Sequence, residues 1–147
     1  ANCGFERAWS AHLVSRWAGT AVKNVAARAH ADAPWTRGEF LLTESGVEGS
    51  LVYALSRPLR GALESTGRAI LEVDLLPERD ATALARALVG PRTGQSLAKW
   101  LERRAGLRGV KAALLRELAA PAAQGDAAAL AEAIKRLPIT LHGTRPL

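Results

Sequence analysis

Residues 43–50 hold the side chains whose types and spacing are best suited to chemistry. Two glutamates alternate there with two glycines, between a threonine and a serine. Two carboxylates beside a helix N-terminus can orient a cationic ligand group or accept a proton, and they can equally serve only to solvate a turn and to interact with the helix dipole. Free backbone N–H groups in such a turn attract anions. The candidate cofactor- or substrate-facing residues are Thr43, Glu44, Gly46, Glu48, Gly49 and Ser50.

A second candidate is a run of basic side chains on two expected helices around a glycine-containing turn. Lys99 and Arg103 are four residues apart, as are Arg104 and Arg108, which is helical spacing. The arrangement superficially resembles a helix-turn-helix, whose second helix enters the major groove. That helix would be GVKAALLREL, which is mostly apolar, so a packed helix with a basic outer face explains it better than base reading. Contact with an RNA or DNA backbone remains open. The candidate face for an anionic partner is Lys99, Arg103, Arg104, Arg108 and Lys111, followed by Arg116.

Other catalytic and cofactor signatures are weak in this sequence. GPRTGQS at 90–96 has three residues between its glycines where a phosphate-binding loop needs four, and Gln95 stands where the lysine should be. The sequence contains no G-x-G-x-x-G dinucleotide fingerprint. His12, His30 and His142 are far apart and Cys3 stands alone, so no ligand spacing indicates a metal. We therefore expect no catalytic residue and no metal in this chain.

The elements that would position these side chains follow from hydrophobic periodicity. Aromatic and apolar residues recur every fourth position from Phe5 to Trp17, which predicts one helix within residues 1–19. Its aromatic stripe would pack in a core or form a homodimer interface. Strands are expected at 20–29 and 39–43, followed by a tight turn at Gly46 and Gly49. Ser50 would cap a helix that Pro58 breaks near Arg57.

Alternation of apolar and polar side chains over 68–75 predicts a half-buried strand of the antiparallel kind. After it, residues 78–137 predict four short helices, three of them capped by Asp80, Ser96 and Asp126. Residues 137–142 predict a last strand. The fold class is therefore α+β: a small antiparallel β-barrel-like lobe, residues 1–77 and 137–147, with an inserted four-helix bundle lobe, residues 78–136.

Composition sets the class of the protein. The 147 residues carry a formal net charge of +6, which fits an anionic partner or simply an arginine-rich solvated surface. No apolar run is long enough to span a membrane, and the start lacks a signal-peptide pattern. The single cysteine suits a reducing compartment, so we expect a cytoplasmic protein. Methionine is absent, which we interpret as a piece of a longer protein.

Several stretches together resemble one known family. NCGFERAWS, RWAGTAVKNVA, GEFLLTESGVEGSLVYALS, LEVDLLP, GQSLAKWLERRAGL and LPITLHGTRPL are similar to the insert region of the BaiN/YhiN-type NAD(P)/FAD-dependent oxidoreductases, which are bacterial flavoproteins. Many relatives carry Thr-His-x-Gly-x-Ser-Gly-Pro in the third stretch. Thr43, Gly46 and Gly49 match that pattern, whereas Glu44, Glu48 and Ser50 differ from it, which indicates a subfamily with its own pocket lining.

The resemblance implies a three-part enzyme. A Rossmann-like FAD domain is assembled from the two ends of the parent chain, and a β-barrel lobe with a helical lobe is inserted between them. This chain would be that insert, with no cofactor of its own, and its partner would be the FAD-binding domain of the same chain. The parent's substrate, a small molecule or an RNA, is not implied. The alternative hypothesis is a basic nucleic-acid-binding module.

Overall fold

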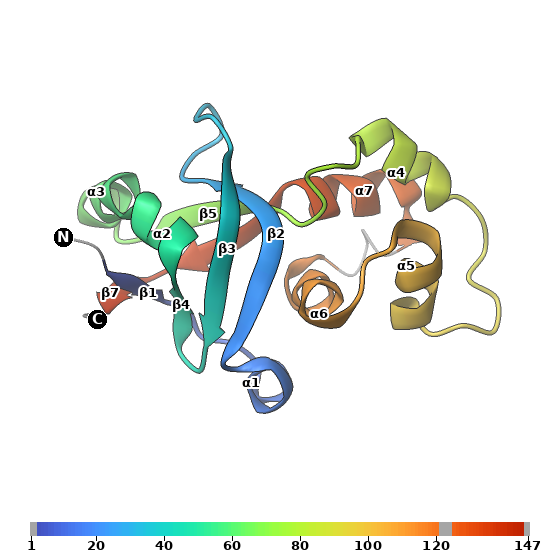
Figure 1. The fold of residues 1–147 in the computed structure, drawn as a ribbon, viewed down its shortest axis with the longest axis horizontal. Coiled ribbons are helices and arrows are strands. Elements are labelled where there is room, and N and C mark those ends of the chain that lie inside the picture. Colours follow the sequence, from blue (N-terminus) through green and yellow to red (C-terminus); the bar gives the residue numbers. More distant parts are fainter. Residues whose placement is uncertain (1–2, 121–124, 146–147) are drawn as a thin grey trace.

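The computed structural model describes residues 3–120 and 125–145. In these residues one antiparallel sheet is combined with a set of short helices (Figure 1). The strands are β1 (Gly4–Glu6), β2 (Thr20–Arg28), β3 (Thr36–Thr43), β4 (Gly46–Glu48), β5 (Ala69–Asp74), β6 (Leu137–Leu141) and β7 (Gly143–Arg145). The helices are α1 (Ala11–Trp17), α2 (Ser50–Ala54), α3 (Ser56–Thr66), α4 (Ala81–Ala87), α5 (Leu97–Ala105), α6 (Gly109–Leu118) and α7 (Ala127–Lys135).

The sheet has the strand order β6-β5-β2-β3-β4-β1-β7, and every neighbouring pair is antiparallel. Its edge strands β6 and β7 are consecutive in the chain, with only His142 between them. They therefore cannot pair side by side, and no ladder between them closes the sheet. The α+β class is confirmed, but the prediction of a barrel-like closure is wrong: the described strands form a sheet that is not closed into a barrel.

The first helix is shorter than predicted. Phe5 lies in β1 and Trp9 precedes α1, which begins after its N-cap Ser10. The reason is long-range pairing: Phe5 is opposite Val47 of β4 on one side and Thr144 of β7 on the other. Two ladders stabilise an extended backbone that the four-residue spacing alone could not reveal. The aromatic stripe proposed as a dimer interface is therefore not formed on one helix.

The predicted glycine turn is also different in the structure. Gly46 begins β4, and the turn lies earlier, at Glu44 and Ser45. Gly49, not Ser50, is the residue that precedes α2, and Ser50 is already helical. The break expected near Arg57 is found at Leu55, between α2 and α3. Pro58 then sits in the first turn of α3, where its missing N–H removes no helical hydrogen bond.

The four predicted helices after β5 are all present as α4 to α7, which we call the helical lobe; the sheet with α1 to α3 is the β lobe. Asp80, Ser96 and Asp126 accept hydrogen bonds from backbone N–H groups in the first turns of α4, α5 and α7, as the sequence predicted. The helical lobe lies to one side of the sheet, and its neighbours in the chain, β5 and β6, pair with each other (Figure 1).

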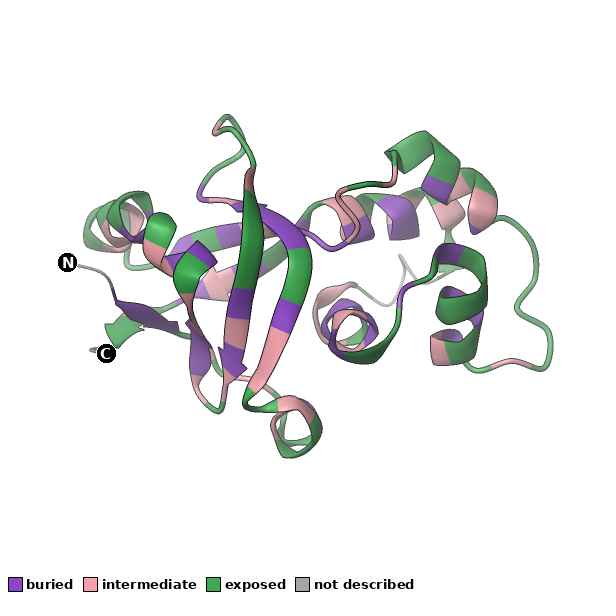
Figure 2. Cartoon of the chain, in the orientation of Figure 1, coloured by how far each residue is buried: buried purple, intermediate pink, exposed green. Residues whose placement is uncertain are grey.

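A continuous apolar core runs through both lobes. Buried positions recur at every second residue along most of β5 and β6, the burial colours of Figure 2 show buried residues along the strands, and Leu71 and Val73 of β5 are fully buried. Ile70 of β5 is apolar but 39% exposed, so it too follows the strand period. Leu101, Leu114 and Ile134 fill the helical lobe. The buried residues of the sheet and those of the helical lobe belong to one apolar cluster, so the two lobes share one core.

Candidate functional site

The residue 43–50 segment is strand and helix start rather than an open loop. A Cβ atom on Gly46 would lie 1.8 Å from the carbonyl oxygen of Phe5, so only glycine allows β1 to approach β4. Gly49 has a φ of 102°, a conformation that other residues rarely adopt. Both glycines are thus explained by backbone geometry, independently of any ligand.

The polar residues of this segment are spread along β4. Glu44 is exposed in the turn before the strand, Glu48 is half-buried at the strand's end, and Ser50 is exposed beyond it. Thr43 is half-buried at the end of β3. Helix α2 is only five residues long, so its N-terminus offers a small dipole at most. The segment therefore supplies separate polar contacts and not one convergent site.

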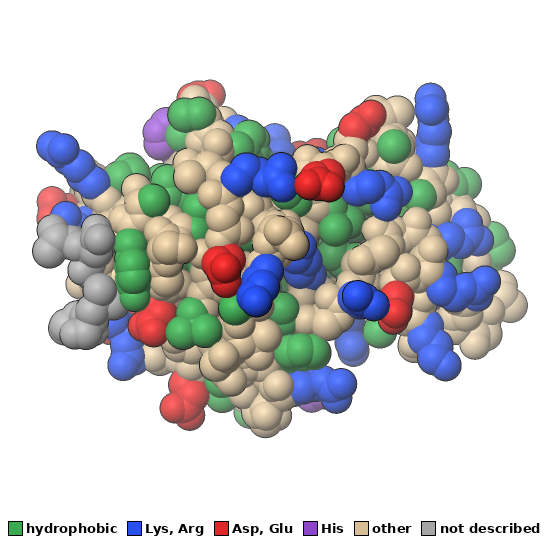
Figure 3. Space-filling model, viewed as in Figure 1, with side chains coloured by type: hydrophobic (Ala, Val, Ile, Leu, Met, Phe, Trp, Pro, Cys, Tyr) green, Lys and Arg blue, Asp and Glu red, His purple; other side chains and the backbone are tan. Residues whose placement is uncertain are grey.

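The predicted basic residues differ in their exposure and in their contacts. Lys99, Arg103, Arg104 and Arg108 are exposed, whereas Lys111 is half-buried. Arg104 donates to the carbonyl of Val89, in the link between α4 and α5, at 3.4 Å. Lys111 turns toward the β lobe and donates to the carbonyl of Asn24 at 3.0 Å. On the face shown in Figure 3, Lys and Arg side chains are scattered over both lobes with Asp and Glu among them.

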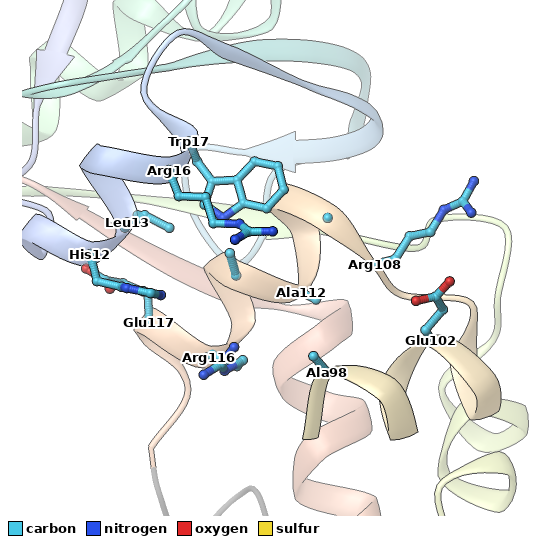
Figure 4. Close-up of a pocket in the computed structure, with 12 residues that line it drawn as sticks. His12, Leu13, Arg16, Trp17, Ala98, Glu102, Arg108, Ala112, Arg116 and Glu117 are labelled. Atoms are coloured by element: carbon cyan, nitrogen blue, oxygen red, sulfur yellow. The ribbon is translucent and has the colours of Figure 1, made fainter. Parts of the chain in front are cut away.

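Two residues of the predicted basic run, Arg108 and Arg116, line a groove between the lobes. It has a volume of about 690 Å³ and is lined by α1 on one side and by α5 and α6 on the other. Figure 4 shows Arg16 and Trp17 projecting from α1, and Arg116 from α6. The Arg16 guanidinium lies 5.3 Å from the centre of the Trp17 ring, so a planar cation and an aromatic surface stand together. We call this hollow the α1–α6 groove.

The charge of the α1–α6 groove is mixed but mainly positive. Arg16, Arg108 and Arg116 line it together with His12, against the acidic Glu102 and Glu117. Glu117 is already engaged, because its carboxylate accepts from the backbone N–H of Ser10 at 2.7 Å and from the Ser10 hydroxyl at 2.6 Å. Those two bonds join α1 to α6. Such a groove is suited to an anionic or planar ligand.

Sequence reasoning missed the α1 side of this groove. His12, Arg16 and Trp17 were either set aside or assigned to a core stripe, because their neighbours α5 and α6 lie about a hundred residues away in the chain. No local pattern in the sequence indicates that contact. Arg108 and Arg116 were singled out by their charge, but the sequence did not predict which residues they face.

A second hollow lies where β2, β3 and the β5–α4 link meet the helical lobe. We call it the Lys111 pocket; its volume is about 310 Å³. Burial lowers the pKa of Lys111 from its usual value of 10.5, Asp74 opposes that shift, and Arg37 adds to it. Asn24 and Arg37 also line an adjoining hollow of about 430 Å³ that reaches Ser50. Ser50 and Lys111 are thus connected by residues that no sequence pattern singled out.

No metal centre emerges from this geometry. Within residues 3–120 and 125–145, no three His, Cys, Asp or Glu side chains are grouped so as to hold a metal ion. None of the helices in that described part is long and apolar enough to cross a membrane.

The architecture defines an α+β domain in which a helical lobe is inserted between two adjacent strands of an antiparallel sheet. A family model described as "HI0933-like protein barrel and H2TH domain" matches residues 1–147. The chain belongs to this HI0933-like family, which is the BaiN/YhiN family, and the resemblance seen in the sequence is confirmed. A comparison with proteins of curated function finds no match.

Proposed function

We propose that this chain is the insert domain of an FAD-dependent, NAD(P)H-linked oxidoreductase, in which it covers the flavin and shapes the substrate pocket. The observation that carries the proposal, beside family membership, is the pairing of the first and last described strands. Gly4 of β1 is opposite Arg145 of β7, and the two ends lie together in Figure 1. A longer chain can therefore leave an FAD-binding domain and return to it at one place.

The surface that meets the FAD-binding domain in this proposal includes residues 43–50. Strand β4 pairs with β1, so the segment lies one strand away from the point where the chain would continue. Glu44 and Ser50 are exposed at the two ends of β4 and can contact a neighbouring domain. The insert keeps the lobe boundaries expected from the sequence, 1–77 with 137–147 and 78–136, and acts in the cytoplasm.

In this proposal the flanking domain, and not the described residues of this chain, forms the flavin cradle. Gly46 and Gly49 serve strand packing and the start of α2, and α2 is too short to hold a diphosphate in the manner of a dinucleotide-binding helix. FAD, held by the flanking domain, supplies the redox chemistry. The contribution of this chain is to exclude water and to orient the substrate.

A deletion tests the proposed cover. In the full-length protein, a short Gly-Ser linker replaces residues 3–145, which the β1–β7 pairing allows without stretching the flanking domain. We expect the flavin to remain bound, its fluorescence to be quenched by iodide several times more strongly than in the intact protein, and turnover to be lost. Equal quenching with and without the insert would show that the insert does not cover the flavin.

The α1–α6 groove favours a second candidate, binding of an RNA or DNA backbone. Arg16, Arg108 and Arg116 are placed to contact phosphates, and Trp17 offers a ring on which a base can stack. The domain could then hold part of a nucleic-acid substrate in the α1–α6 groove while the flanking domain holds the flavin, so the two candidates are compatible.

Salt dependence tests this second candidate. Binding of a short single-stranded RNA by the double variant Arg16→Ala/Arg108→Ala is compared with binding by Arg57→Ala/Arg68→Ala, which removes two exposed arginines of the β lobe. We expect weaker binding and a shallower salt slope, by about 0.7 per lost phosphate contact, for the first variant only. Equal losses in both variants would mean non-specific attraction to net charge.

A further inference from the structure

The Lys111 pocket brings together cations from three distant parts of the chain. Arg37 comes from β3, Arg79 from the β5–α4 link and Lys111 from α6. The pocket lies in the seam between the lobes and shares no lining residue with the α1–α6 groove. Its volume of about 310 Å³ is at the lower end of small-molecule sites. It could hold one small ligand or one end of a larger ligand.

The acidic groups nearby are already engaged or lie at the rim. Asp74 accepts from Lys135 at 2.8 Å and from the backbone N–H of Leu76 at 3.0 Å. Glu78 approaches Arg37 at 3.3 Å, but its side chain is 83% exposed, so this pair is weak. The positive charge inside the pocket is therefore only partly compensated.

The donors of the pocket have capacity left. Lys111 has three N–H bonds, and in the described residues its one hydrogen bond is to the carbonyl of Asn24. Arg79 uses one guanidinium nitrogen, Nη1, on the carbonyl of Ala105 at 2.9 Å. Asn24 lines both this pocket and the adjoining one, and its side-chain amide carries two further N–H donors.

The backbone at Asn24 is held in an unusual conformation. Its φ is 54°, at the point where the β2–β3 register shifts between Val22 and Val25. A bulge of this kind changes the direction of a side chain and of its carbonyl. Here the bulge carries the carbonyl that Lys111 meets, so the strand irregularity and the half-buried lysine belong to one arrangement.

A half-buried lysine that is not paired with a carboxylate does not stabilise the folded protein in the absence of a ligand, because burial disfavours its charged form. An anionic ligand would reverse that balance. We infer that the Lys111 pocket is a binding site for an oxyanion, the phosphate or carboxylate group of a small molecule, which accepts hydrogen bonds from Lys111, Arg37 and the Asn24 amide. This inference does not depend on the proposed role beside a flavin.

Titration of the protein with inorganic phosphate, and separately with acetate, followed by two-dimensional amide NMR, tests the site and distinguishes the two chemistries. We expect one of the anions to shift the signals of Asn24, Arg37 and Lys111 in a saturable way. Lys111→Met should weaken that binding by about tenfold. Lys99→Met removes the same charge from the exposed surface of α5 and should leave the binding unchanged.

A fold control accompanies the titration. Lys111→Met should unfold at a temperature no lower than the parent protein, since it removes a desolvated charge. Asn24→Gly keeps the backbone conformation without strain and removes the amide, so it should fold and bind the anion more weakly. No saturable shift with either anion below about 10 mM, or equal weakening by Lys111→Met and Lys99→Met, would overturn the inference. Saturation by RNA alone, with neither small anion bound, would overturn it as well.

Discussion

At the scale of single residues, Gly46 has a packing role that the sequence did not predict, while its predicted place beside a ligand stays a prediction. The sequence pointed to it as part of a ligand-facing turn, whereas the structure gives it a packing role against Phe5. Gly46→Ala should therefore lower the free energy of unfolding by roughly 1–3 kcal/mol or more, because the β1–β4 pair must move apart. Urea unfolding followed by circular dichroism measures this loss.

The matched control for that variant is Gly61→Ala. Gly61 lies in α3 with no atom within 4 Å of its missing Cβ. The exchange should stabilise the protein by up to about 1 kcal/mol, because alanine favours a helix. A Gly46→Ala protein as stable as the parent would contradict the close approach of β1 to β4.

Lys111 leads to a prediction about pH at the same scale. Because its pKa is lowered from 10.5 in the folded protein, the unfolded chain binds more protons between the lowered pKa and 10.5. The contribution of this group to the free energy of unfolding must then rise with pH in that window. The stability difference between Lys111→Met and the parent should shrink as the pH approaches 10.5.

Urea unfolding of both proteins at a series of pH values measures that difference. The charged groups around Lys111 are Asp74, Arg37, Glu78 and Arg79, and both proteins contain all of them. A difference that grows with pH would mean that the lysine is stabilised as a cation in the folded protein, contrary to its burial.

At the scale of elements, the contact between α1 and α6 defines one wall of the α1–α6 groove. Ser10 caps α1 and also donates twice to Glu117 of α6. Glu117→Ala should lower the free energy of unfolding by roughly 1 kcal/mol, since the contact is exposed. The double variant Ser10→Ala/Glu117→Ala should lose less free energy of unfolding than the sum of the two single variants, because both substitutions remove the hydrogen bond between the Ser10 hydroxyl and the Glu117 carboxylate.

A double-mutant cycle of Ser10→Ala and Glu117→Ala checks this coupling. The control cycle pairs Ser10→Ala with Glu102→Ala, which lines the same groove from α5. Only the first cycle should show a coupling energy above about 0.5 kcal/mol. Additive effects in both cycles would mean that α1 and α6 are held by apolar packing alone.

The elements also show which features a sequence can predict. Asp80, Ser96 and Asp126 mark helix starts correctly because a cap is a local interaction within three residues. The three-residue strands β1 and β4 were missed because they are too short to show a period of two. β1 exists through partners that lie about forty and a hundred and forty residues away, and β4 pairs with β1 on one side and with the preceding strand β3 on the other.

The same distinction applies to the candidate sites. Charge singled out Arg108, Arg116 and Lys111 as part of a face for an anionic partner, which stays a prediction; in the structure these residues line hollows. Neither hollow could be predicted, because each lies between the two lobes, and the contacts that form it join residues far apart in the chain. The Asn24 bulge has no sequence signal beyond the tolerance of asparagine for a positive φ.

At the scale of the whole molecule, the first and last described strands, β1 and β7, lie at the side of the sheet away from the helical lobe (Figure 1). In an inserted domain this geometry puts residues 43–50 near the flanking FAD-binding domain and the α1–α6 groove farther out. The helical lobe is then free to meet a substrate that arrives from solvent.

We propose that the flavin belongs to the flanking domain and that this chain covers it. The most direct measurement is the absorption spectrum of two purified proteins: the 147-residue chain and the longer protein that contains it. We predict a colourless short chain and a longer protein with a flavin spectrum. A short chain that retains flavin, or a longer protein that binds none, would contradict the account.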